Sequence, residues 1–289
     1  MDEGRETGGA GVPGFPGFPG ISGDSGISGE GKADATSCVP PGEALAAGLY
    51  VVGTPIGNLE DITLRALRVL GGVAAVYAED TRHTRVLLER YGIDKPLVSC
   101  HQFNERGRLA EILERVRRGE AVALVSDAGM PGISDPGGLA AATVRRAGLP
   151  VRAVPGPTAV ATAVAVCGAK GGGGYWFEGF LDNRTAARRR RLKELSGLGA
   201  PVVFYESTHR ILKLLDEVEE ELGAERRLLV GRELTKAHEE WLEGTPGELR
   251  AHWANGHSHK GEFVVVLHPA GKEKKEKEPR DSRLDSENL

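Results

Sequence analysis

The chain has 289 residues, a formal net charge of −4 at pH 7, 40 % hydrophobic residues and 27 % charged residues. These proportions are those of a globular protein that can build a core, and the slightly negative charge gives no whole-chain case for nucleic acid, so any such surface must come from local patches. The cysteines Cys38, Cys100 and Cys167 are scattered and lack a Cys-x-x-Cys spacing. This argues against a disulfide framework and a zinc site, and it fits a reducing cytoplasm.

No segment of the sequence is typical of a membrane protein. The chain lacks an apolar run of about eighteen residues, and its first residues lack a basic start followed by an apolar stretch. We therefore expect a cytoplasmic protein without a membrane span or a signal peptide.

The two ends of the chain do not have the composition of a folded domain. Glycine recurs at every third position from Gly8 to Gly29, a collagen-like register that is too short for a stable triple helix, so we expect 1–46 to be a flexible arm. Residues 271–289 are rich in Lys and Glu and predict a solvated tail. The glycines at 171–174 interrupt the middle of the chain. We expect two α/β lobes, at 47–170 and 171–270.

The first lobe repeats the pattern strand, turn, helix, which predicts parallel βαβ units. Asn58 and Asp61 resemble a capping box that opens a helix with Leu64, Leu67 and Leu70 on its apolar face. In chain order, strands are expected at 49–52, 73–78, 97–100, 121–125 and 151–154, each followed by a helix, the last a buried helix at 159–166.

The second lobe has short apolar runs close together, which favour a mixed sheet. Ser207 is expected to cap a helix that carries Ile211 and Leu215. Thr245 and Glu248 have the spacing of a capping box and predict another helix start. Strands are expected at 175–180, 201–205, 226–231, 239–243 and 262–267.

The loop after the strand at 121–125 is the strongest local indication of a ligand. It contains Asp127 and Asp135 among glycines and prolines and leads into a helix. Ligands of open α/β sheets bind beyond the carboxyl ends of such strands. Glycine lets the backbone approach a ligand closely, and the two carboxylates are possible acceptors for ligand hydroxyl or amino groups. Ordinary turn chemistry is the alternative.

Seven motifs occur in order between about Leu49 and Leu267. They are Gly53–Leu59, Ala78–Thr84, Ser126–Gly129, Pro155–Thr158, Phe204–Arg210, Gly231–Lys236 and Lys260–Phe263. Through these motifs together the chain resembles the tetrapyrrole methylase superfamily, within it the branch that methylates ribosomal RNA.

The resemblance implies a mostly parallel first sheet, a mixed second sheet and S-adenosyl-L-methionine in the cleft between the lobes. It further implies a homodimer that methylates the 2′-hydroxyl of a cytidine in the decoding region of 16S rRNA, free or in the small ribosomal subunit. The residues that the resemblance places at the cofactor are Pro55, Asp127, Ala128, Gly129, Ile133, Pro157, Thr158, Tyr205, Glu206 and Ser207.

A ribose hydroxyl is a poor nucleophile, so a base within hydrogen-bond reach would assist the transfer. Glu79, Asp80, Glu233 and Lys236 each follow a predicted strand and are all candidates. The alternative for the first two is an ion pair that fixes the next helix, and for the last two a salt-bridged turn.

The densest basic run in the sequence predicts the RNA contacts. It comprises Arg184 and Arg188, Arg189, Arg190 and Arg191, which can bind phosphates or form only a solvated helix face. Arg82 and His83 are further candidates. His83, His101 and His209 lack the spacing of zinc ligands, and no metal is expected.

Two features depart from the family pattern. Met130 stands where the family commonly has Thr, so a hydroxyl contact is not expected there. The segment Leu181–Arg184 replaces the more usual Leu-Pro-x-Lys on the presumed RNA side.

Two other functions remain open. One is C-methylation of a tetrapyrrole precursor, which uses the same fold and cofactor. The segments Glu79–His83 and Tyr205–Arg210 favour the RNA branch instead. The other is a non-catalytic module that binds RNA or S-adenosylmethionine, which retained methyl transfer would exclude.

Overall fold

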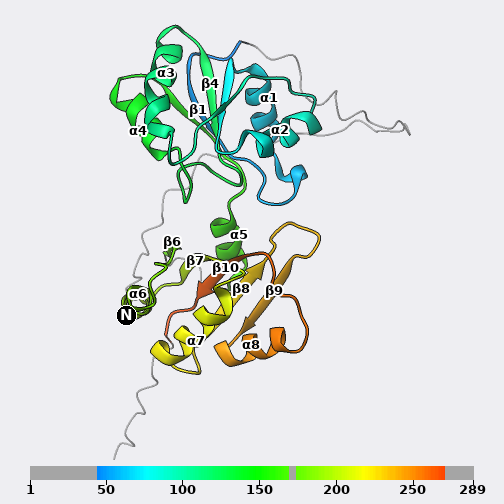
Figure 1. The fold of residues 1–289 in the computed structure, drawn as a ribbon, viewed down its shortest axis with the longest axis vertical. Coiled ribbons are helices and arrows are strands. Elements are labelled where there is room, and N and C mark those ends of the chain that lie inside the picture. Colours follow the sequence, from blue (N-terminus) through cyan, green and yellow to red (C-terminus); the bar gives the residue numbers. More distant parts are fainter. Residues whose placement is uncertain (1–43, 169–173, 271–289) are drawn as a thin grey trace, which may run out of the picture. The chain divides into compact units, whose positions relative to one another are not determined.

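The computed structural model describes residues 44–168 and 174–270 (Figure 1). The expected flexible arm, apart from residues 44–46, and the expected charged tail lie outside the described residues. So does most of the glycine run at which we expect the lobes to divide, and that boundary stays a prediction.

The first sheet has five strands, all parallel, in the order β3-β2-β4-β1-β5. The expected parallel sheet is therefore confirmed. The central strand β4 is buried along its whole length, which explains why its sequence is an uninterrupted apolar run. The strands are β1 (Gly48–Val52), β2 (Ala75–Ala78), β3 (Leu97–Ser99), β4 (Ala121–Val125) and β5 (Val151–Val154).

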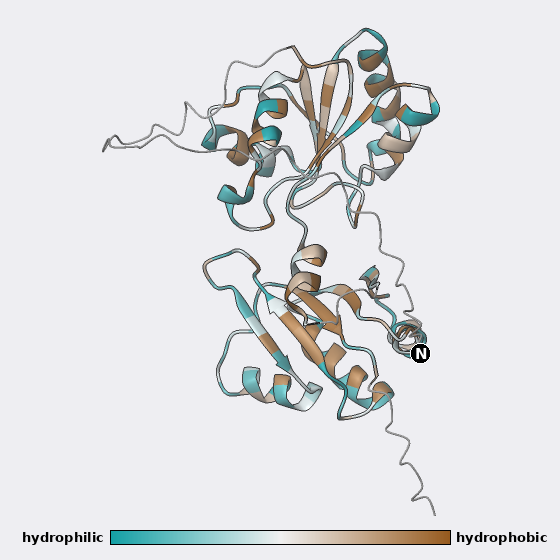
Figure 2. Ribbon diagram, turned by 180° about the vertical axis from the view of Figure 1, so that it is seen from behind, coloured by the Kyte–Doolittle hydropathy of each residue, from teal (hydrophilic) through white to brown (hydrophobic). Residues whose placement is uncertain are grey.

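Helices cover both faces of this sheet (Figure 1). Alternate residues of β4 point to opposite faces, so Ala123 packs with α1 and α2, whereas Leu124 packs with α3 and α4. Figure 2 shows the apolar residues gathered in the strands and the polar ones on outward helix faces. The helices are α1 (Leu64–Gly72), α2 (Thr81–Arg90), α3 (Glu105–Arg117) and α4 (Gly138–Arg146).

The prediction for the start of α1 was wrong in one respect. The Asn58 side chain accepts a hydrogen bond from Glu60 N at 3.1 Å, but it caps a separate 3-10 helix at Leu59–Asp61. The backbone is extended at Ile62, and α1 begins after Thr63, whose hydroxyl accepts from Ala66 N. A second cap residue five positions downstream therefore takes the role that the spacing assigned to Asn58.

The second sheet also has five strands, in the order β6-β7-β10-β8-β9. Only β6 and β7 pair in parallel, so the sheet is mixed, as predicted. Its strands are β6 (Trp176–Phe180), β7 (Val202–Ser207), β8 (Leu228–Arg232), β9 (Glu240–Gly244) and β10 (Glu262–Leu267).

Two hydrophobic clusters cover the faces of the second sheet. Helices α6 (Thr185–Ser196), α7 (Ile211–Leu222) and α8 (Pro246–Ala254) pack on one face, and α5 (Ala159–Val166) packs on the other. Only one side of α5 is buried, at Val160 and Ala163, whereas Val166 is 54 % exposed. The helix expected to be fully buried is thus half-buried.

The start of α7 also differs from the prediction. Ser207 is the last residue of β7, and the helix begins only after Arg210, without a side-chain cap. By contrast, the capping box of Thr245 and Glu248 at the start of α8 is confirmed. None of the helices in the described parts of the chain is both long and apolar enough to span a bilayer.

Candidate active site

Two loops meet closely beyond the carboxyl ends of β1 and β5. A Cβ atom placed on Gly53 would lie 2.7 Å from the Gly156 Cα, and one placed on Gly156 would lie 2.9 Å from the Gly53 Cα. Because real Cβ atoms do not approach backbone so closely, both positions require glycine. These two glycines let the neighbouring strands β1 and β5 deliver their loops to one place.

The loop after β4 is joined to the loop after β1. Thr54 N donates to Gly129 O at 2.9 Å, and Gly129 N donates back to Thr54 O at 3.1 Å. Gly129 has φ = 77°, a left-handed conformation that glycine adopts readily. The buried Thr54 hydroxyl donates to Ser126 O and fixes the first residue of the β4 loop. The loop is therefore held in a defined position.

These loops form a pocket of about 490 Å³ together with the ends of β7 and β10. This volume lies in the range of small-molecule sites, which are mostly apolar with a few polar groups. The lining residues are Ile56, Ala128, Gly129, Met130, Ile133, Ser134, Asp135, Thr158, Ala159, Phe180, Tyr205, Glu206, Ser207, Thr208, His209, Leu234, Gly261, Glu262, Phe263 and Val264.

Glu206 is the most deeply buried acidic group of the pocket, with 2 % of its surface exposed. Its Oε1 accepts from Ser207 N at 2.7 Å and lies 3.2 Å from the Arg210 guanidinium. Its Oε2 has no hydrogen-bond partner among the described residues. Burial raises the pKa of Glu206, although Ser207 and Arg210 oppose the shift. Since this oxygen is sealed from solvent, it is an unsatisfied acceptor inside the protein.

Three carboxylates, those of Glu79, Asp127 and Asp135, lie near one another beyond the ends of β2 and β4. Asp127 Oδ1 accepts from Asp80 N at 2.9 Å, and Asp127 N lies 3.5 Å from Glu79 Oε2. Burial, and then the charge of Asp135, raises the pKa of Glu79. Burial, and then the charge of Asp127, raises the pKa of Asp135. A raised carboxyl pKa in a pocket is a mark of functional sites, and of these two groups Asp135 lines the large pocket whereas Glu79 lines neither pocket.

The structure brings together most of the residues expected at the cofactor. Ala128, Gly129, Ile133, Thr158, Tyr205, Glu206 and Ser207 line the large pocket. Pro55 and Asp127 instead line a smaller pocket of about 130 Å³, which also contains His83. Pro157 lines neither, although its carbonyl oxygen would lie 3.5 Å from a Cβ placed on Gly129.

The four candidate bases do not line the large pocket. Asp80 caps α2 through Arg82 N and pairs with the Arg82 side chain at 2.6 Å. The hydrogen bonds from Arg82 hold the pKa of Asp80 well below its usual range. Asp80 therefore has the alternative role named above, an ion pair that fixes the next helix. Its low pKa makes the group a weak base.

Glu233 and Lys236 form an ion pair at the edge of the pocket. Lys236 Nζ contacts Glu233 Oε1 at 2.9 Å and the pocket residue Glu262 at 2.8 Å. Burial lowers the pKa of Lys236, but the two carboxylates outweigh this effect and raise it overall. On Glu233 burial acts in the opposite direction and raises the pKa, but the hydrogen bonds that this carboxylate accepts from Lys236 and from the Glu262 backbone lower the pKa overall. Both shifts keep the groups charged and disfavour a role as base.

The expected RNA contacts fall into two groups. Arg82 has a side chain 90 % exposed, and His83 is exposed beside Asp127 in the smaller pocket. Arg184, just before α6, and Arg190 within it have side chains 82 % and 78 % exposed, although Arg184 pairs with Asp182 at 2.8 Å and Arg190 lies 3.8 Å from Glu194. These residues are accessible to a large ligand.

The remaining arginines of α6 are paired with acidic residues. Arg188 was expected to bind phosphate, but it is 3 % exposed and its guanidinium holds Glu217 at 2.5 and 2.6 Å. Its charge is therefore not available to RNA. Arg189 pairs with Glu220 and Glu221, and Arg191 pairs with Glu178 and Glu194. The sequence shows the basic run but not these partners.

Several pocket residues had not been assigned from the sequence. Glu262 and Phe263 lie in the motif Lys260–Phe263, and His209 lies in the motif Phe204–Arg210. Both motifs carried the family resemblance, but it gave these three residues no role in the site. Phe180 and Ser134 gave no signal, because each reaches the pocket only through the folding of its loop or strand end.

Residues 48–250 match the family model of the Tetrapyrrole (Corrin/Porphyrin) Methylases, and the chain belongs to this family. Curated relatives that align with most of the chain are named ribosomal RNA small subunit methyltransferase I. The protein from Thermotoga maritima is 47 % identical over 78 % of this chain and 99 % of its own length. That from Borrelia garinii subsp. bavariensis is 43 % identical over 76 % of this chain and 97 % of its own length.

Solved structures share the fold at lower identity. Uroporphyrin-III-C-methyltransferase from Thermus thermophilus has a TM-score of 0.54 and 24 % identity and covers 76 % of this chain and 93 % of its own. The methyltransferase CobJ has a TM-score of 0.58 and 20 % identity over 78 % of this chain and 95 % of its own. These likenesses establish the fold alone.

Proposed function

We propose that this protein transfers the methyl group of S-adenosyl-L-methionine to the RNA of the small ribosomal subunit, at the 2′-hydroxyl of a cytidine in the decoding region of 16S rRNA. The observation that carries the proposal is the pocket, because its walls contain seven of the residues that the family resemblance assigned to this cofactor. The identity of 41 to 47 % to relatives named as ribosomal RNA methyltransferases supports the choice of RNA.

The residues of the pocket fit S-adenosylmethionine. The cofactor carries an ammonium group, ribose hydroxyls and an adenine amine, all hydrogen-bond donors, and the carboxyl group of Asp135 is an acceptor in the pocket. Ile56, Ile133 and Leu234 supply apolar wall for its uncharged parts. When bound, the cofactor supplies an electrophilic methyl group on a positively charged sulfur.

The chain's own residues must then position the ribose hydroxyl and accept its proton. Among the three candidate carboxylates, Glu79 is the one whose pKa is raised, whereas the raised pKa of Lys236 keeps its ammonium group protonated. A general base works best when its pKa approaches the working pH, so we favour Glu79 over Asp80, Glu233 and Lys236. Lys236 and Glu233 are positioning residues in this proposal, because they hold the Glu262 wall of the pocket.

The RNA would lie over the exposed residues beside the pocket. Arg82 and His83 lie in the first turn of α2, and His83 lines the smaller pocket with Asp127, so we take them as the phosphate and base contacts nearest to the chemistry. Arg184 and Arg190 would extend the contact along α6. A homodimer and the two-lobe division remain expectations from the family.

Substrate choice is the experiment that tests this proposal. The full-length protein is incubated with labelled S-adenosylmethionine and, in separate reactions, undermethylated small subunits, free 16S rRNA and a uroporphyrinogen-type tetrapyrrole. Label in the RNA of the first or second reaction is the expected result. Label in the tetrapyrrole alone would favour the C-methyltransferase, and cofactor binding without any transfer would favour the non-catalytic module.

A further inference from the structure

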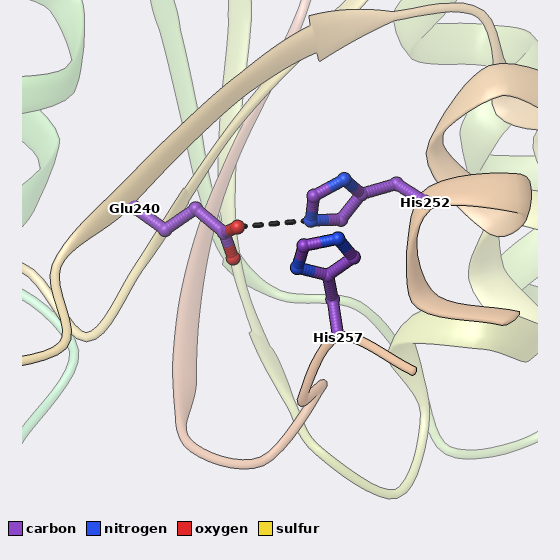
Figure 3. Close-up of side chains that lie close together, drawn as sticks. All are labelled: Glu240, His252 and His257. Carbon is purple, nitrogen blue, oxygen red and sulfur yellow. Dashed lines mark hydrogen bonds and ion pairs between the residues drawn. The ribbon is translucent and has the colours of Figure 1, made fainter. Parts of the chain in front are cut away.

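A second group of polar side chains lies between β9, the edge strand of the mixed sheet, and helix α8. It comprises Glu240, His252 and His257, whose ligand-type atoms all lie within 4.8 Å of one another (Figure 3). His252 Nε2 lies 2.9 Å from Glu240 Oε1. The rings of His252 and His257 stack, with their centroids 3.9 Å apart and their planes at 18°. Neither the cofactor nor the RNA contact uses these residues.

Local structure explains why the three residues meet. Glu240 begins β9, and the capping box at Thr245 starts α8 directly after that strand. The helix returns along β9, so His252 in its last turn faces Glu240. His257 follows in the loop that joins α8 to β10. Three separate elements thus converge on one point.

We propose that Glu240, His252 and His257 bind a divalent transition-metal ion, of which Zn²⁺ is the best match. Two imidazoles and one carboxylate are a frequent ligand set for zinc, with a further position left to water. In a tetrahedral site, Zn–N bonds near 2.0 Å place ligand atoms about 3.3 Å apart. The 2.9 Å pair therefore needs to open by only a few tenths of an ångström, whereas the stacked ring of His257 must rotate to direct a nitrogen at the same point, and this residue is exposed.

Arg232 prepares the carboxylate for this role. Its Nε donates to Glu240 Oε2 at 3.0 Å, so Oε2 is occupied and Oε1 faces the histidines. The carboxylate is thus oriented by a partner outside the coordination shell, as metal ligands commonly are. The nearby guanidinium charge reduces the affinity for a cation.

The ion would fix the loop between α8 and β10 to the sheet. The same Arg232 donates to Lys260 O at 3.0 Å, and the next two residues, Gly261 and Glu262, line the cofactor pocket. Binding at His257 would therefore hold the segment that forms one wall of the pocket. We infer a structural role, since the ligands themselves do not line that pocket.

The simplest alternative is a hydrogen-bonded pair of Glu240 and His252 with His257 stacked on it. The two explanations differ in what they require of His257. A metal site loses a ligand when His257 is replaced, whereas the hydrogen-bonded pair does not. The scattered cysteines and the spacing of His83, His101 and His209 predicted no metal, and the proposed site departs from that expectation.

The test is binding of Zn²⁺ alone to the untagged full-length chain by isothermal titration calorimetry. Co²⁺ serves as a second probe, because its visible absorption reports coordination, which d¹⁰ Zn²⁺ does not. The variants are His257→Ala and Glu240→Gln, with His259→Ala as the matched control from the same loop. All are first checked for folding by circular dichroism.

We expect one equivalent of Zn²⁺ to bind the wild type and His259→Ala alike, and at least about tenfold weaker binding in the other two variants. Zn²⁺ should also raise the thermal midpoint of the wild type and of His259→Ala but not of His257→Ala. Absence of binding, or equal binding by wild type and His257→Ala, would overturn the proposal. So would an equal loss in His259→Ala.

Discussion

The arginines of α6 show that burial decides what a charged residue can do. Arg188 holds the Glu217 carboxylate, itself 1 % exposed, through two short hydrogen bonds. Arg190, two positions later, is 78 % exposed and only 3.8 Å from Glu194. In the sequence the two residues are equivalent members of one basic run. Their side chains nevertheless point to opposite sides of the helix, one inward and one outward.

We predict that Arg188→Ala lowers the free energy of unfolding by about 3–5 kcal/mol, because it leaves Glu217 charged, buried and unpaired. Arg190→Ala should change it by less than about 0.5 kcal/mol, as is usual for an exposed position. Urea denaturation of the two variants measures the difference. Equal stability of both variants would show that the Arg188 pair is not the buried contact described above.

Asp135 is a residue whose burial favours the protonated form. Its pKa is raised in the folded protein, so the folded state holds the proton more tightly than the unfolded chain, and stability falls as the pH rises through the folded-state value. We predict that Asp135→Asn is more stable than the wild type at pH 7. The gain should shrink as the pH falls toward 3.8, the ordinary pKa of the group.

Thermal unfolding of both proteins across this pH range checks the prediction. The same variant should bind S-adenosylmethionine more weakly, because an acceptor in the pocket is partly lost. A variant that is less stable than the wild type at neutral pH would contradict the assigned direction of the pKa shift.

At the scale of elements, the crossing of two glycine loops positions the site. Gly53→Ala would place a Cβ 2.7 Å from both Gly156 Cα and the sulfur of the pocket residue Met130. We predict that the loops separate and that S-adenosylmethionine binding falls by at least tenfold, about 1.4 kcal/mol. Calorimetric titration measures the affinity.

Gly71→Ala is the matched control. Gly71 lies within α1, and a Cβ there would meet nothing within 4 Å. Alanine should stabilise the helix by about 0.5–1 kcal/mol and leave cofactor binding unchanged. Loss of binding in both variants would show that the close contact at Gly53 is not the cause.

The sequence predicted the elements best where burial on both faces dominates. The apolar runs at 121–125 and 262–267 became β4 and β10 with the expected bounds. Predictions at element ends were weaker, because several nearby residues can cap a helix. Asn58 and Thr63 both cap, each its own helix, and Ser207 remained in a strand because β7 continues its pairing with β10 to that residue.

The candidate site was predicted in part, for a similar reason. Motifs identify loops, so residues such as Gly129 and Ser207 were found. Partners distant in the chain, such as Arg188 and Glu217 or Lys236 and Glu262, meet only through the packing of α7 or the return of β10. A single sequence does not carry these pairings.

At the scale of the whole molecule, the proposal places RNA on the side where the parallel strands end. We predict that Arg82→Ala weakens binding of 16S rRNA and lowers the slope of log affinity against log salt by about 1, the value for one lost phosphate contact. Arg118→Ala is the control. Arg118 is exposed at the end of α3, just before the amino end of β4. It therefore lies at the end of the strands opposite to Arg82.

Filter binding at several salt concentrations measures both slopes. Equal effects of the two variants would mean that RNA binding depends on positive charge in general rather than on the surface beside Asp127. An unchanged Arg82→Ala would show that the Asp80 ion pair is the whole role of this arginine.

The central claim is that this methylase acts on a ribose hydroxyl of the small-subunit RNA. The most direct test labels undermethylated small subunits with S-adenosylmethionine, digests the RNA and identifies the labelled nucleotide by chromatography and nuclease mapping. We expect label in a 2′-O-methylcytidine from the decoding region. Label on a base, or in a nucleotide outside that region, would contradict it.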